Sequence, residues 1–281
     1  MSARPTLQPL RDWPMAQAAR VHTVFADIDD TLSTDGRITG RAYQALESLR
    51  NAALRVVPVT GRPAGWCDHI ARMWPVDAVV GENGAFWMWH DDATGRLRSR
   101  HRLDEPERAA RAQRLREVAE RILREVPGCA LASDQFCRLY DIAIDFREDV
   151  PPLPAPAVER IVSIMRAAGL HAKVSSIHVN GWLGDWDKLE TTRLMMRERF
   201  GVDVDDPVER ARCVFVGDSP NDAPMFAFFP NAVGVANVVD FADRIDAMPA
   251  WITASRAGAG FAELAQRLLE ARRRFSQEVN R

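Results

Sequence analysis

The stretch that decides the fold is Val21–Thr31, with the sequence VHTVFADIDDT. Its first part, Val21–Ile28, is a short apolar run, rich in β-branched residues, that stops in acidic and polar residues. Such a run predicts a buried strand that ends in a loop. Ligands and substrates often bind at the ends of such strands. Asp27, Asp29 and Asp30 are therefore the first candidates for a functional site.

Helical and extended segments alternate on both sides of a long central region. After the first strand, the pattern predicts helix 41–54, strand 55–59, helix 64–73 and strand 78–80. Toward the end it predicts helix 189–200, strands 213–216 and 232–235, and a final helix 261–275. Repeated β-α-β units indicate an α/β domain with a doubly wound parallel sheet, covered by helices on both faces.

The central region has a different pattern. It predicts a hairpin from Phe86, helix 106–126, strand 140–146, a helix from the proline-rich link 151–156 to near Gly169, and strand 173–179. In strand 140–146, Ile142, Ile144 and Phe146 alternate with more polar residues, which predicts a sheet with one wetter face. We therefore expect a core domain of residues 1–85 and 186–281, with an inserted α+β domain of residues 86–185.

Composition excludes several classes of protein. The 37 Lys and Arg nearly balance the 39 Asp and Glu, so no basic field is available to hold nucleic acid. No apolar stretch approaches a membrane span, and no secretory signal is evident. The four cysteines form no CxxC or Cys/His metal pattern. We expect a cytoplasmic protein, monomeric or homodimeric, that acts on a small molecule.

Acidic residues follow two of the predicted strands. Asp27, Asp29 and Asp30 end the first, and the segment 217–222 (GDSPND) brings Asp218 and Asp222 to the end of strand 213–216. Either group alone could be a solvated turn or a helix cap. Two such groups at the same edge of a sheet repel each other unless a cation is present, which indicates a hard divalent metal.

The segment Val59–Pro63 (VTGRP) brings a hydroxyl, free backbone amides and a guanidinium to this edge. These groups suit a phosphate, although Thr60 could instead cap the following helix, with Pro63 in its first turn. Lys188 is one of the two lysines of the chain, and it begins a predicted helix between the insertion and the GDSPND segment. Its position favours a role at the site over an ordinary surface role.

In their order and context, these segments resemble the haloacid dehalogenase-like (HAD) phosphatase superfamily over Phe25–Asp222. The resemblance implies a Rossmann-like core and a Mg²⁺-dependent phosphatase that forms a phospho-aspartate. It implies a catalytic set in which Asp27 is the nucleophile, Asp29 the general acid and base, Thr60 a phosphate ligand and Lys188 the phosphate-binding lysine. Asp30 departs from the glycine that is commonest at its position.

The resemblance also implies two sets of ligands. The substrate-binding residues are Thr60, Gly61, Arg62, Asn83, Lys188 and Asn221. The Mg²⁺ ligands are Asp27, Asp218, the backbone carbonyl of Asp29, and Asp222 in support.

The insertion lies between Thr60 and Lys188, where the superfamily inserts its type-2 caps. The segment 81–85 (GENGA) just before it resembles the IIB branch, which has C2B caps and includes Cof-type and sucrose-phosphate phosphatases. In that branch the cap contacts the substrate, so Arg138, Asp145, His178 and Asn180 are candidates to contact the leaving group, with structural hydrogen bonds as the alternative.

The function that this resemblance implies is hydrolysis of small phosphorylated metabolites, above all sugar phosphates. A phosphomutase of the same superfamily and a non-catalytic phosphometabolite-binding protein remain alternatives. The sequence does not distinguish between sugar, nucleotide and other leaving groups.

Overall fold

The computed structural model describes residues 7–279, so residues 1–6 and 280–281 of the predicted core domain lie outside the described residues. The central sheet has six parallel strands in the order β1-β15-β14-β13-β2-β5. These strands are β1 (Gln8–Pro9), β2 (Thr23–Ala26), β5 (Arg55–Pro58), β13 (Cys213–Gly217), β14 (Val233–Gly234) and β15 (Trp251–Ile252). The decisive apolar run thus becomes β2, an interior strand that is buried throughout.

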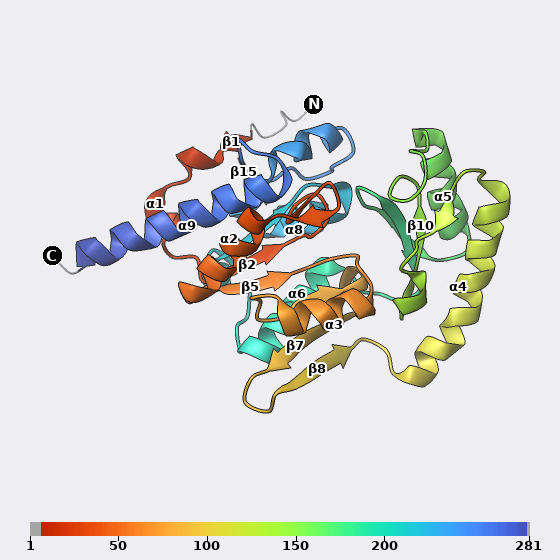
Figure 1. The fold of residues 1–281 in the computed structure, drawn as a ribbon, viewed down its shortest axis with the longest axis horizontal. Coiled ribbons are helices and arrows are strands. Elements are labelled where there is room, and N and C mark those ends of the chain that lie inside the picture. The colour runs from red at the N-terminus through yellow and green to blue at the C-terminus, as the bar shows by residue number, and fades with distance from the viewer. Residues whose placement is uncertain (1–6, 280–281) are drawn as a thin grey trace.

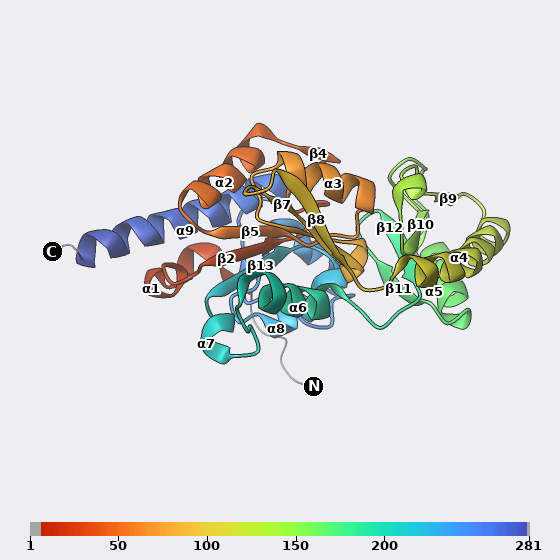
Figure 2. The same cartoon turned by 90° about the horizontal axis from the view of Figure 1, so that it is seen from below.

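Helices cover both faces of this sheet, as Figure 2 shows, with α2, α3 and α9 on one side and α6, α7 and α8 on the other. The helices of the core are α1 (Met15–Ala18), α2 (Gly40–Asn51), α3 (Ala64–Met73), α6 (Lys188–Phe200), α7 (Pro207–Arg210), α8 (Ala223–Phe228) and α9 (Ala257–Val279). The doubly wound α/β core is therefore confirmed.

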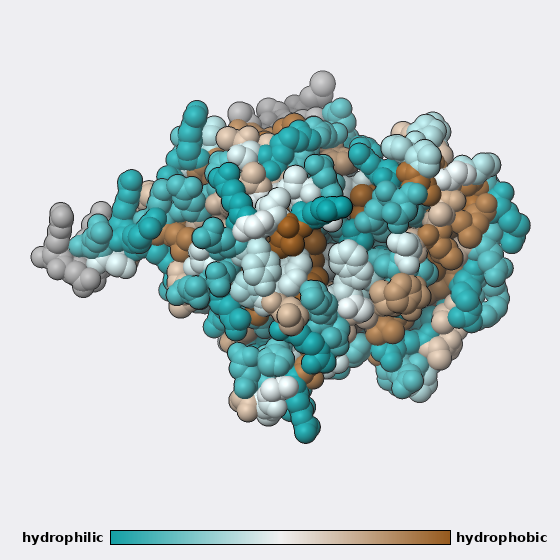
Figure 3. Space-filling view, viewed as in Figure 1, coloured by the Kyte–Doolittle hydropathy of each residue, from teal (hydrophilic) through white to brown (hydrophobic). Residues whose placement is uncertain are grey.

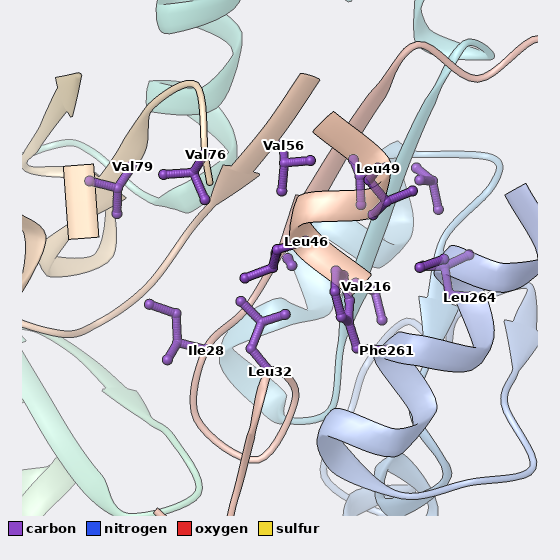
Figure 4. Packing of buried hydrophobic residues seen from close by; sticks show 14 of the residues in the cluster. Ile28, Leu32, Leu46, Leu49, Val56, Val76, Val79, Val216, Phe261 and Leu264 are labelled. Carbon is purple, nitrogen blue, oxygen red and sulfur yellow. The ribbon is translucent and has the colours of Figure 1, made fainter. Parts of the chain in front are cut away.

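The helices α2 and α9 pack on one face of the sheet through apolar side chains that recur along each helix. Thr39 caps α2 by accepting a hydrogen bond from the N–H of Ala42. Leu46 and Leu49, one turn apart, are fully buried with Phe261 of α9 in a cluster that includes sheet residues (Figure 4). Burial of each such side chain contributes about 1.5–3 kcal/mol, so this face fixes the helices on the sheet.

The hairpin formed by β7 (Phe86–Asp91) and β8 (Arg96–His101) pairs with β6 (Val79–Gly81) in a three-stranded sheet. The prediction placed this hairpin in the insertion, but Phe86 and Trp87 are buried in the core clusters. Its apolar strand β7 therefore packs on the core. A short hairpin of β3 (Ser33–Thr34) and β4 (Arg37–Ile38) was not predicted.

The cap has an antiparallel sheet in the order β11-β12-β10-β9, packed against two helices. Its elements are α4 (Glu105–Glu125), β9 (Ala130–Leu131), β10 (Asp141–Asp145), α5 (Ala155–Ala167), β11 (His171–Val174) and β12 (His178–Trp182). The single strand predicted over 173–179 is wrong, because a turn separates β11 from β12. The hydroxyl of Ser175 accepts the N–H of His178 (3.0 Å), which stabilises that turn.

The polar face of β10 is not wet, contrary to the prediction. Ile142 and Ile144 lie in the apolar core of the cap as expected, but Asp141 and Asp145 are only 3% and 1% exposed. Internal hydrogen bonds satisfy these carboxylates. Asp141 accepts from Asn180 (2.9 Å), for example, and Asp145 accepts backbone N–H groups of residues 147–149.

The surface shown in Figure 3 is mostly hydrophilic, and apolar side chains gather over the cap between α4 and β10. The large apolar side chains exposed in this part of the chain are Leu123, Leu131, Phe136 and Leu139. Within residues 7–279, no helix combines the length and hydropathy needed to cross a membrane.

Candidate active site

The strands β2, β5 and β13 are parallel neighbours, so their carboxyl ends meet at one edge of the sheet. The backbone N–H of Asp27 donates to the carbonyl of Val216 (2.9 Å), which keeps the ends of β2 and β13 level. Asp27, Thr60 and Asp218 therefore lie at the edge where the sequence predicted them, and the cap lies beyond it (Figure 1).

Asp27, Asp218 and Asp222 form a buried acidic cluster, in which one carboxylate oxygen of each lies within 4.8 Å of the others. Burial raises the pKa of Asp27 to about 8, although Lys188 opposes the shift. Burial and the neighbouring carboxylates also raise the pKa of Asp218. A divalent cation would relieve this repulsion, and clustered carboxylate oxygens are the donors that such hard cations prefer. The residues present therefore fit a divalent metal.

Lys188 provides the positive charge that contacts this cluster. It begins α6, where Asp187 caps the helix by accepting the N–H of Glu190 (2.7 Å). Its Nζ donates to Oδ1 of Asp27 (2.6 Å) and of Asp222 (2.7 Å). Although burial opposes it, these carboxylates raise the pKa of Lys188. The lysine is therefore a fixed cation beside the predicted nucleophile.

Further hydrogen bonds orient the acidic cluster. One oxygen of Asp222 accepts the backbone N–H groups of Asp218 (3.1 Å) and Ser219 (3.3 Å). Asp218 accepts from the hydroxyl of Thr31 (3.2 Å) and from Nδ2 of Asn237 (3.1 Å). Asn237 was not predicted, because it follows β14 outside any of the recognised segments.

The side chain of Asp29 contacts Arg62, whose Nη2 lies 2.8 Å from Oδ1. The Arg62 side chain is 4% exposed, stacks on Trp66, and also contacts Glu148 (2.6 Å) and Asp134 (3.4 Å) of the cap. Arg62 was predicted as a substrate-binding residue, and in the structure it joins the core to the cap. Neither Asp134 nor Glu148 was predicted. The metal contact of the Asp29 carbonyl stays a prediction.

Gly61 follows Thr60 at the edge of the central sheet and lies close to the side-chain amides of Asn83 and Asn180. The hydroxyl of Thr60 accepts the N–H of Arg62 (3.0 Å), and α3 has Pro63 as its N-cap, so the alternative role of Thr60 as that cap is wrong. A Cβ on Gly61 would lie 3.2 Å from Nδ2 of Asn83 and 3.4 Å from Oδ1 of Asn180. Glycine therefore keeps both amides close to the site.

Two residues of the GENGA segment have left-handed backbone conformations, Glu82 (φ 42°) and Asn83 (φ 54°). Nδ2 of Asn83 is buried without a hydrogen-bond partner. The carboxylate of Glu82 accepts backbone N–H groups from Ala64 (3.0 Å), Leu139 (2.9 Å) and Tyr140 (2.6 Å). Glu82, which was not predicted, thus connects the core to the segment that enters β10.

The four candidate residues of the cap divide into two pairs. His178 and Asn180, both on β12, line the chamber between core and cap. Arg138 and Asp145 do not line it. Arg138 donates to the carbonyl of Gly61 (2.9 Å), and Asp145 holds the turn that follows β10. The structural alternative therefore holds for these two.

This chamber has a volume of about 10 Å³, which is roughly the space needed by a single water molecule. Its lining residues are Asp27, Asp29, Gly61, Arg62, Ser175, Ser176, His178, Asn180, Ser219 and Asn221. Five of the predicted catalytic, substrate-binding and metal-binding residues do not line it: Thr60, Asn83, Lys188, Asp218 and Asp222. A phosphate ester is far larger, so the cap has to open before one enters.

Comparison with known proteins supports the resemblance. Residues 24–120 match the model of the haloacid dehalogenase-like hydrolase family. No curated protein matches the sequence.

Solved structures with the same fold cover nearly the whole chain. A Thermoplasma acidophilum protein has a TM-score of 0.65 and 16% identity, and the match covers 89% of this chain and 98% of that one. A HAD/Cof-like hydrolase from Plasmodium vivax has a TM-score of 0.62 and 16% identity, with 92% and 99% covered. A Synechocystis sucrose-phosphatase, in complex with sucrose and phosphate, has a TM-score of 0.59 and 15% identity, with 88% and 97% covered. At these identities the likeness shows the fold.

Proposed function

Because this chain has the haloacid dehalogenase-like hydrolase fold, with a match to that family's model over residues 24–120, we propose that it is a Mg²⁺-dependent phosphatase of small phosphate monoesters. Sugar phosphates are the substrates that we propose. The observation that carries the proposal is the buried contact of Asp27 with Lys188, beside two further carboxylates.

Asp27 is the proposed nucleophile. Its carboxylate attacks phosphorus in line, forms a phospho-aspartate and displaces the alcohol of the substrate. Lys188 and the metal-binding carboxylates Asp27, Asp218 and Asp222 surround the transferred group. A Mg²⁺ ion held by them would neutralise charge on the phosphoryl oxygens. Thr60 and Asn221 donate further hydrogen bonds.

Asp29 is the proposed general acid and base. It gives a proton to the leaving alcohol and then removes one from the water that hydrolyses the phospho-aspartate, a role typically worth about 10²–10⁴-fold. In the structure, the guanidinium of Arg62 contacts the Asp29 carboxylate. We infer that movement of the cap separates Arg62 from Glu148 and Asp134, and that Arg62 then turns from Asp29 toward the substrate, which leaves Asp29 free for proton transfer.

The proposed substrate class rests on the cap and on the structural neighbours. One neighbour is a sucrose-phosphatase and another is related to trehalose-6-phosphate phosphatase, and both cover most of this chain. We propose that the cap spans residues 104–185, since the preceding hairpin pairs with β6. A cytoplasmic location remains part of the proposal.

The test is phosphate release by the purified protein with Mg²⁺, across sugar phosphates, nucleotides and cofactor phosphates. We expect release to need the metal, and Asp27→Asn to lower it by at least about 10³-fold. Asp222 still contacts Lys188 in this variant, so its thermal unfolding should remain close to that of the wild type.

Asp68→Asn, on the exposed face of α3, is the matched control and should retain full activity. Near-wild-type release by Asp27→Asn would overturn the mechanism. Intramolecular return of the phosphoryl group to a sugar, without free phosphate, would favour a phosphomutase instead.

A further inference from the structure

The wall of the chamber that faces the leaving group is polar, but it has little positive charge to offer. Arg62 is the one arginine or lysine among the described lining residues. The neutral groups nearby include Oγ of Ser176, which is buried without a hydrogen-bond partner, as is Nδ2 of Asn83 beside Gly61. These atoms could hydrogen-bond to hydroxyl groups.

Carboxylates already surround the guanidinium of Arg62. Asp29 lies 2.8 Å away on the core side, and Glu148 (2.6 Å) and Asp134 (3.4 Å) approach from the cap. Arg138 neutralises part of this charge, since it contacts Asp134 (2.9 Å). Three carboxyl groups thus surround Arg62, so little of its positive charge remains for an anionic ligand.

Glu148 contacts both of the groups that could otherwise attract an anion. Besides Arg62, it contacts Nε2 of His178 (2.9 Å), which is itself a lining residue. Although burial opposes the shift, the contacts with His178 and Arg62 lower the pKa of Glu148 to about 2. Glu148 therefore carries its negative charge at any ordinary working pH.

We propose that Glu148 is a specificity-determining residue, which makes the site accept uncharged, polyhydroxylated leaving groups and reject those with a second negative charge. It contacts both Arg62 and His178, so a leaving group that approaches these residues also approaches a carboxylate. An anionic leaving group meets a like charge in a poorly solvated chamber, and such repulsion is an effective way to discriminate. This inference rests on the proposed phosphatase activity.

The test compares pairs of substrates that differ by one carboxylate. The first pair is glucose 6-phosphate and 6-phosphogluconate, and the second is glycerol 3-phosphate and 3-phosphoglycerate. For the wild type we expect kcat/KM to be at least about tenfold higher for the neutral member of each pair. In Glu148→Gln this ratio should fall by about tenfold or more, since glutamine keeps the shape but removes the charge.

The ratio of two substrates on one preparation does not depend on the fraction of protein that is folded, so a purely structural loss leaves it unchanged. Glu159→Gln, on an exposed part of α5, is the control and should keep the wild-type ratio. Glu148→Lys should shift the preference further toward anionic leaving groups, and it offers a second variant.

The outcomes separate this inference from the function on which it rests. Equal kcat/KM for both members of the pairs in the wild type, or an unchanged ratio in Glu148→Gln, would overturn the role of Glu148 and leave the phosphatase proposal standing. Absence of release from all four esters and from 4-nitrophenyl phosphate, in the presence of Mg²⁺, would overturn both.

Discussion

Two groups of buried charges border the chamber, and they are built differently. The nucleophile cluster consists of Asp27, Lys188, Asp218 and Asp222, all from the core. The cap network consists of Arg62 and Asp29 from the core with Asp134, Glu148 and His178 from the cap. The first group lies within the core, whereas the contacts of Arg62 with Asp134 and Glu148 exist only while core and cap are in contact.

This difference assigns separate tasks to the two groups. Opening of the cap separates Arg62 from Glu148 but leaves the contact between Lys188 and Asp27 intact. In the proposed mechanism, the groups that attack phosphorus therefore stay organised, while those around the leaving group are reassembled each time the cap closes. Catalytic groups benefit from such preorganisation, and groups that admit and release ligands need to move.

The largest expected effect comes from Lys188→Met, in the nucleophile cluster. This change leaves the carboxylates of Asp27 and Asp222 buried without their shared cation, a loss of roughly 3–5 kcal/mol of folding stability. The phosphoryl group also loses a charged donor, so turnover should fall by at least about 10²–10³-fold. Phosphate release and urea unfolding measure the two effects.

The other lysine of the chain provides the control. Lys173 lies on β11, is only partly buried and contacts none of the nucleophile cluster, so Lys173→Met should affect neither quantity strongly. Similar losses of phosphate release and of stability in the two variants would contradict a specific role of Lys188 in the nucleophile cluster.

A smaller effect is expected where the core meets the cap. Glu82→Gln replaces one carboxyl oxygen with an NH2 group, which then faces the backbone N–H donors of Ala64 and Leu139 or those of Tyr140 and Asp141. Buried donors left unsatisfied cost about 1–3 kcal/mol, so the free energy of unfolding should fall by that amount.

Urea unfolding measures this change, and Glu47→Gln on the exposed side of α2 is the matched control. An unchanged midpoint in Glu82→Gln would show that the connection between core and cap does not depend on this carboxyl group. A loss in both variants would point to a general effect of charge removal.

The sequence predicted the nucleophile cluster because its members are local to recognisable elements. Asp27 and Asp218 directly follow buried apolar strands, and Lys188 begins a helix. Parallel strands end at one edge, so local patterns were sufficient to bring these residues together.

The cap network could not be predicted in the same way. Glu148 lies in an irregular segment after β10, and no periodicity distinguishes it from exposed acidic residues. The alternating run over 173–179 predicted one strand, whereas the hydrogen bonds of Ser175 produce a turn that brings Ser176 into the chamber. Contacts between domains depend on how the cap docks, which no local pattern encodes.

The smallest expected effect concerns Asp30, which stands where the family most often has glycine. Its φ of 56° lies in the left-handed region, which costs a non-glycine residue roughly 1–2 kcal/mol but which aspartate tolerates better than most. Its backbone N–H bonds to Ser33 Oγ (3.1 Å) and its carbonyl accepts from Asn237 (2.9 Å). Asp30 therefore contributes to this turn through the hydrogen bonds of its backbone.

Asp30→Gly should keep full activity and gain up to about 1 kcal/mol of stability, because relief of strain exceeds the added entropy of the unfolded chain. Ala53→Gly, at a φ of 58° after α2, reports the strain alone. Asp30 also raises the pKa of Asp218 by charge repulsion, after the larger effects of burial, Asp27 and Asp222. A larger gain in Asp30→Gly than in Ala53→Gly would therefore measure that repulsion, whereas a tenfold loss of activity would show that the carboxylate itself serves the nucleophile cluster.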